Sequence, residues 1–97
     1  MLHTINKAPD RSDCLDACLR VCGRDAAVLL IEDGVLAALA GSAAAAKLCD
    51  TVTHVYVLLP DAQARGIGAR IAPGIVAIDH AGFVQLCCEH PVVQSWY

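Results

Sequence analysis

The alternation of apolar and polar positions predicts strands and helices that follow one another along the chain. Short apolar runs are expected to form strands at residues 2–5, 26–31, 54–59 and 75–78. The run "AAVLLI" at 26–31 has no alternating polar position, which is typical of a strand buried on both faces of a parallel sheet. Strands that alternate with helices predict right-handed crossovers and a parallel sheet with helices on both faces.

Helices are predicted between the strands, and several have a residue that marks their start or end. They cover roughly 10–22, 35–41, 42–49, 60–66 and 79–89. Gly23 is expected to end the first helix, because glycine is common just after a helix C-terminus. Ser42 and Asp79 are expected to cap the helices that follow them. Residues 1–97 therefore predict one three-layer α/β domain with a small, mainly parallel sheet flanked by helices.

The composition is unusually apolar for a domain of 97 residues. Hydrophobic residues make up 57% of the chain, charged residues 18%, and the mean hydropathy is +0.53. Because so small a domain exposes much of its surface to water, we expect a partner to cover some of it. No apolar run approaches the roughly 20 residues of a membrane span, and the start does not resemble a secretory signal. We therefore expect a cytoplasmic protein.

Charge and motif spacing argue against several classes of ligand. The formal net charge is −3 and no Lys/Arg stripe is present, so direct binding of nucleic acid is not expected. The stretch "GIGARI" places Ile71 where a dinucleotide-binding loop needs its third glycine, so no such cofactor is expected. No metal site is expected either, since the histidines have no paired spacing: His3, His54, His80 and His90.

Polar side chains follow the predicted strands, at the edge of a parallel sheet where ligands usually bind. They are Asn6 and Lys7, Glu32 and Asp33, Asp61 with Arg65, and Asp79 with His80. The simplest role for each acid is to cap a helix or to end a strand. Glu32 and Asp33 could also bind a metal or a basic partner, but adjacent side chains after a strand diverge. The pair alone does not predict a site.

The most unusual stretch is "CLDACLRVC", which spaces Cys14, Cys18 and Cys22 four residues apart. On a helix of about 100° per residue they form one stripe, with Cys18 near the centre of the apolar arc. This pattern favours burial, the usual state of free cysteines. The thiols rise about 6 Å per step, too far apart to surround one metal ion, and in the cytoplasm structural disulfides are not expected.

A reactive thiol is the remaining alternative for this helix. A thiolate forms where a helix N-terminus or a cation lowers the pKa and where the sulfur is accessible. Cys14 lies in the first turn, where the helix dipole favours its thiolate. Cys18 is one turn deeper and would need a neighbour such as Lys7 or His3. Physical principles alone thus slightly prefer Cys14.

Several sequence blocks, in order over essentially the whole chain, resemble the TusB/DsrH family. They are "LHTINKAP" at 2–9, "LLIEDGVLAAL" at 29–39, "VYVLLPDAQARG" at 55–66, and "IDHAGFVQL" followed by "VQSWY". The resemblance implies a flavodoxin-like subunit without flavin. It also implies a two-of-each hexamer with TusC/DsrF-like and TusD/DsrE-like subunits, a complex that relays persulfide sulfur.

The resemblance implies one of two pathways. In tRNA 2-thiouridine synthesis the complex takes sulfur from TusA and passes it to TusE, whereas in dissimilatory sulfur oxidation the DsrEFH complex works alongside DsrC. A cysteine in the first helix is typical of DsrH, and counting from "LHT" it falls on Cys18. We therefore expect a DsrH-type subunit in sulfur oxidation, with Cys18 as the candidate sulfur-carrying thiol and Cys14 as the weaker one. A TusB-type subunit in tRNA thiolation is the alternative.

The resemblance leaves the chemistry of this chain open. The principal sulfur-carrying cysteine of such complexes lies in the TusD/DsrE subunit, so this chain can instead be a noncatalytic scaffold whose Cys18 lines an interface. His80 stands where the family often has tyrosine. Cys14 and the four remaining cysteines, Cys22, Cys49, Cys87 and Cys88, are not part of the family pattern.

Overall fold

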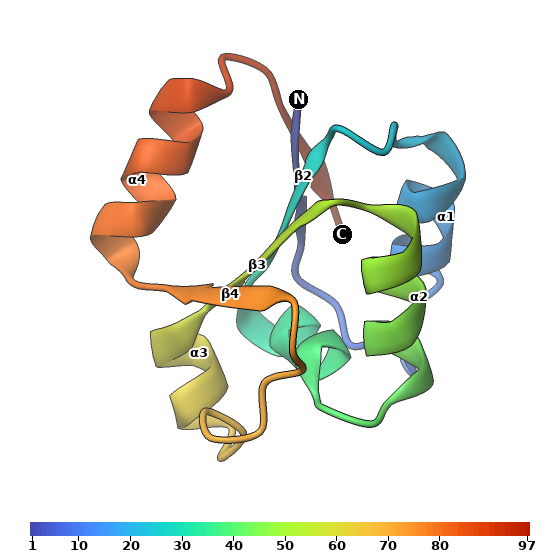
Figure 1. The fold of residues 1–97 in the computed structure, drawn as a ribbon, viewed down its shortest axis with the longest axis vertical. Coiled ribbons are helices and arrows are strands. Elements are labelled where there is room, and N and C mark those ends of the chain that lie inside the picture. The colour runs from blue at the N-terminus through green and yellow to red at the C-terminus, as the bar shows by residue number, and fades with distance from the viewer.

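The apolar runs form a five-stranded parallel sheet in the computed structural model, which describes residues 1–97 (Figure 1). The strands are β1 (Leu2–Ile5), β2 (Ala27–Leu30), β3 (His54–Leu58), β4 (Ile75–Ile78) and β5 (Val93–Trp96). The helices are α1 (Cys14–Val21), the 3-10 helix η1 (Glu32–Ala38), α2 (Ala43–Thr51), α3 (Leu59–Ala64) and α4 (His80–Glu89). The predicted three-layer α/β fold with a small parallel sheet is confirmed.

The order of the strands explains where the helices lie. The sheet runs β4-β3-β2-β1-β5, so the chain moves in one direction from β1 to β4 and then returns to pair β5 with β1. Because crossovers between parallel strands are right-handed, reversing the direction moves the connecting helix to the other face. Figure 1 accordingly shows α4 on one side of the sheet and α1 with α2 on the other. In flavodoxin itself the order 2-1-3-4-5 reverses earlier in the chain.

The two faces of the sheet bury unequal cores. The larger core has 17 buried residues and joins the inward faces of α1, α2, η1 and α3 to the strands. The smaller has four, Leu2, Ala27, Leu29 and Leu86, and lies under α4. Strands β1 and β2 contribute to both cores and are buried throughout, as the uninterrupted apolar run of β2 predicted.

Strand β5 is absent from the sequence prediction. Its residues Val93–Trp96 pair in parallel with β1, from Leu2↔Val93 to Ile5↔Trp96. The strand lies at the sheet edge, where three of its four residues are exposed, and its sequence "VQSW" is half polar. A short, exposed edge strand lacks the apolar signature on which the other four were recognised.

The helix ends are in part as predicted. Ser42 Oγ accepts a hydrogen bond from the Ala45 N–H at 3.1 Å, and Asp79 Oδ1 accepts one from the Gly82 N–H at 2.9 Å, so both caps are confirmed. Helix α1 ends at Val21, close to the predicted end, but its C-cap Cys22 has extended backbone and Gly23 has no positive φ, so Gly23 does not form the expected glycine cap. Of the predicted helix at 35–41, only residues 35–38 are helical, and they belong to the 3-10 helix η1, which starts earlier, at Glu32, and ends at Ala38. No helix has the length and apolar character needed to cross a membrane.

Candidate functional site at the carboxyl edge of the sheet

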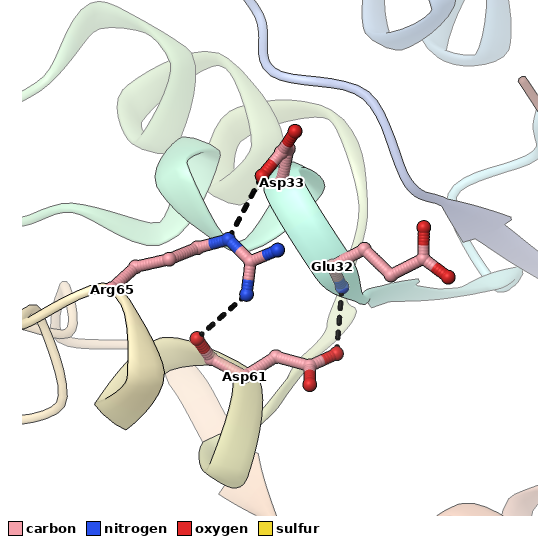
Figure 2. A network of polar contacts seen from close by, with 4 residues as sticks. All are labelled: Glu32, Asp33, Asp61 and Arg65. Atoms are coloured by element: carbon pink, nitrogen blue, oxygen red, sulfur yellow. Dashed lines mark hydrogen bonds and ion pairs between the residues drawn. The ribbon is translucent and has the colours of Figure 1, made fainter.

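The polar residues that follow β2 and β3 meet at the carboxyl edge of the sheet. The Glu32 N–H donates to Asp61 Oδ2 at 2.7 Å, and Arg65 Nε donates to Asp33 Oδ1 at 2.9 Å. Arg65 Nη1 also donates to the Asp61 carbonyl oxygen at 3.1 Å. Figure 2 shows Arg65 reaching across from α3 to the start of η1, while the Glu32 carboxylate points away from Asp33. These acids bind protein groups, and the adjacent pair diverges as predicted.

The turn "EDG" has the backbone geometry that this junction requires. Glu32 has a φ of 50°, in the left-handed region that is costly for a residue with a side chain. A Cβ on Gly34 would lie 2.0 Å from the carbonyl oxygen of Ile5, so only glycine fits against the end of β1. The Asp61 carboxylate stabilises this strained turn, because it accepts a hydrogen bond from the Glu32 N–H. The network therefore accounts structurally for parts of two sequence blocks named above. These are the DGV turn at residues 33–35 and the D-x-x-A-R-G element at residues 61–66.

A polar crevice opens beside this network, at the place between β1 and β5 where the strand order reverses. We call it the β1–β5 crevice; its volume is about 460 Å³ and it is lined by Lys7, Ala8, Arg11, Ser12, Asp33 and Tyr97. Lys7 and Asp33 were expected at this edge. Arg11, Ser12 and Tyr97 were not, although Lys7 and Arg11 are four residues apart in the loop after β1. The side chain amide of Asn6, just before Lys7, has a buried Oδ1 with no hydrogen-bond partner.

A second cavity lies at the amino end of the strands, between α1 and β5. It measures about 630 Å³ and its lining includes His3, Cys22 and Trp96. Trp96 Nε1 donates to His3 Nδ1 at 3.1 Å, which joins the opening "LHT" of the chain to its near-terminal tryptophan. Burial, and then the charge of the chain's N-terminus, lower the pKa of His3, so its imidazole is neutral at pH 7.

Cys18, the main candidate for a sulfur-carrying thiol, lies in this chain's own core. Its side chain is 0% exposed and belongs to the larger cluster, so it does not line a surface that a partner could cover. Burial, and next the neighbouring Cys22 thiol, raise the pKa of Cys18 from 9.0 to about 12. Neither Lys7 nor His3 contributes to that shift or binds the sulfur. At neutral pH the thiol is protonated and inaccessible, the opposite of what a nucleophile requires.

The other five cysteines are more accessible than Cys18. Cys14 is half-buried at the first position of α1, where its N–H donates to Ser12 Oγ at 3.1 Å. Cys22 and Cys49 are half-buried, and on α4 Cys87 is half-buried and Cys88 exposed. All six are free thiols, and no three His, Cys, Asp or Glu side chains are grouped to hold a metal ion. Nothing in the geometry brings Cys14 and Cys18 together in one site.

Known proteins match the chain over almost its whole length. A family model described as "DsrH like protein" matches residues 7–93. Protein TusB of Pectobacterium parmentieri is 42% identical over 99% of this chain and 100% of its own length. Over the same shares, Protein TusB of Erwinia tasmaniensis is 41% identical and that of Escherichia coli K12 is 36% identical.

One solved structure shares the fold. The ychN protein from E. coli matches with a TM-score of 0.78 and covers 98% of this chain and 97% of its own, at 18% sequence identity. At so low an identity the likeness supports the architecture and says nothing about chemistry.

Proposed function

Because the chain belongs to the DsrH/TusB family, we propose that it is a subunit of a cytoplasmic sulfur-relay complex of the TusBCD type, serving tRNA 2-thiouridine synthesis. In that complex it would assemble with TusC-like and TusD-like subunits, two of each, between a TusA-like donor and a TusE-like acceptor. The observation that carries the proposal is the identity of 36–42% with TusB proteins over their entire length.

Within the complex we propose a structural role for this chain, with the sulfur carried by a partner subunit. The Cys18 thiol is fully buried and its pKa is raised to about 12, so the folded chain offers no thiolate at that position. A chain that completes an assembly is expected to expose apolar side chains that its partners can cover. Exposed large apolar side chains occur on several elements: Met1, Val21, Val76, Val84, Val92, Val93 and Tyr97.

The DsrH-type reading, in dissimilatory sulfur oxidation, remains the second candidate. One specific observation favours it, namely a cysteine in the first helix at the position that DsrH shares. Its support is smaller than that of the TusB reading, because the relatives described above carry the TusB name and because the cysteine in question is a core residue. Under this reading Cys18 would accept a sulfane sulfur, and Cys14 would be the alternative acceptor.

Sulfur loading of the assembled complex tests the proposed role. The chain is co-purified with its own TusC-like and TusD-like partners, the complex is treated with a persulfide donor, and the peptides of each subunit are analysed by mass spectrometry. We expect a complex with two copies of each subunit and added sulfur on the TusD-like subunit alone. The Cys18 peptide should stay unmodified, since its thiol is fully buried.

Two outcomes would contradict the proposal in different ways. A chain that stays monomeric in the presence of both partners would refute its membership of the complex. Added sulfur on the Cys18 peptide, abolished by Cys18→Ser, would instead make this chain a sulfur carrier and restore the DsrH-type reading. A matched Cys22→Ser variant controls for nonspecific effects of removing a thiol from α1.

A further inference from the structure

The β1–β5 crevice lies at the one place where the topology of this sheet predicts a ligand. In open α/β sheets, ligands bind in a crevice outside the carboxyl ends of the strands, at the point where the strand order reverses. Here the reversal falls between β1 and β5, because α1 follows β1 on one face while α4 precedes β5 on the other. The crevice contains residues from both strand ends, Lys7 after β1 and Tyr97 after β5.

The lining of this crevice is positively charged, unlike the chain as a whole. Lys7 and Arg11 both line it, and neither forms an ion pair. The acidic wall residue, Asp33, is already bound to Arg65, with 2.9 Å between Oδ1 and Nε. Asp10 and Asp13 belong to the same loop but do not line the crevice. Two cations without an ion pair thus line one crevice of a protein whose net charge is −3.

The remaining groups add hydrogen-bond donors and an aromatic wall. Ser12 Oγ accepts from the Cys14 N–H, which leaves the Ser12 hydroxyl hydrogen free to donate. Tyr97 is 82% exposed and contributes a ring and a phenol hydroxyl to the opposite side. Helix α1 begins at Cys14, two residues after Ser12, so its positive dipole end lies near the same loop. A cavity of about 460 Å³ is ample for a small ligand.

We propose that the β1–β5 crevice is a binding site for an oxyanion group, either a free inorganic anion or the phosphate of a small organic molecule. Lys7 and Arg11 bind the anion's oxygens, Ser12 donates a hydrogen bond, and Tyr97 stacks on any planar part of an organic ligand. The site uses none of the cysteine side chains, so it does not depend on which subunit carries the sulfur.

Binding of two simple probes tests the site. The full chain, labelled with ¹⁵N, is titrated with inorganic phosphate and with phenyl phosphate at an ionic strength of about 0.15 M. Saturable amide shifts are expected at residues 7–12, Asp33 and Tyr97. The Lys7→Gln/Arg11→Gln variant should bind both probes at least about tenfold more weakly, because hydrogen bonds to charged groups are lost. Tyr97→Ala should weaken phenyl phosphate binding more than phosphate binding if the ligand is organic.

A charge-matched control separates a built site from general attraction. Arg20→Gln/Arg70→Gln removes two exposed cations that lie outside the crevice, so it changes the net charge equally. It should leave both affinities within about twofold, because exposed charges at a distance are screened. Equal losses in the two double variants, shifts spread over the surface, or no saturation would each overturn the proposal. Equal affinities for the two probes in the wild-type chain would support the site and identify its ligand as a free anion.

Discussion

Cys18 illustrates how the position of a residue in the fold determines its chemistry. Its place in the centre of the α1 apolar arc was predicted correctly from periodicity, and the structure adds that the arc faces this chain's own core. The sequence could not give that distinction, because an apolar stripe looks the same whether a sheet or a partner covers it. The same limit applied to Cys14, whose place in the first turn was foreseen while its partial burial was not.

The raised pKa of Cys18 predicts a specific loss of stability in alkali. The thiol titrates near 9.0 when unfolded and at about 12 when folded. Between those values the thiol is deprotonated in the unfolded chain and still protonated in the folded chain. The free energy of unfolding therefore falls as the pH rises from about 9 to 12. Below pH 9 the contribution of Cys18 to the free energy of unfolding is constant. Urea unfolding of the wild type and of Cys18→Ala over this range should show a shallower decline in the variant. Parallel declines would mean that Cys18 is not buried.

Gly34 is the residue whose replacement should cost most at the carboxyl edge. An added Cβ would meet the Ile5 carbonyl oxygen at 2.0 Å, and that oxygen belongs to a strand in the centre of the sheet. Gly34→Ala should therefore lower the free energy of unfolding by more than about 2 kcal/mol. Gly23→Ala is the control, because nothing lies within 4 Å of its Cβ position and its φ is negative. Equal stabilities of the two variants, measured in urea, would contradict this account of the DGV turn.

At the scale of elements, the buried strands and capped helices were predictable and the edge strand was not. Runs such as "AAVLLI" and caps such as Ser42 have local signatures that require no knowledge of the fold. Strand β5 depends instead on pairing with β1, a contact between the two ends of the chain. The 3-10 geometry of η1 was also missed, and this element likewise makes a close contact with a distant part of the chain, that of Gly34 with Ile5.

Strand β5 is held by side chains as well as by its backbone. Besides the Trp96–His3 hydrogen bond of 3.1 Å, Thr4 and Ser95 are hydrogen-bonded through their hydroxyls at 3.2 Å. Trp96→Phe would keep an aromatic ring but leave His3 Nδ1 without its donor, which should cost about 1 kcal/mol. We expect faster hydrogen exchange at residues 93–96, with the amides of β3 unchanged. Ser95→Ala serves as a milder control, and unaltered exchange in Trp96→Phe would show that this bond does not hold the strand.

At the scale of the whole molecule, the strand order decides which residues form a site. Lys7 and Tyr97 are at opposite ends of the chain, and only the return of β5 to the side of β1 places them around one crevice. The sequence predicted the edge of the sheet at which polar residues gather, and it predicted the D-x-x-A-R-G and DGV elements as family features. It could not predict that these two elements bind each other, because that contact depends on η1 and α3 lying side by side.

The central claim is that this chain takes part in sulfur relay to tRNA without carrying sulfur on Cys18. The most direct measurement is the 2-thiouridine content of tRNA in an E. coli strain that lacks TusB, TusC and TusD and expresses this chain with its own TusC-like and TusD-like partners. Nucleoside mass spectrometry should find thiolation restored by the wild-type chain and equally by Cys18→Ala, and absent when this chain is omitted. Restoration by the wild type but not by Cys18→Ala, or no dependence on this chain at all, would contradict the claim.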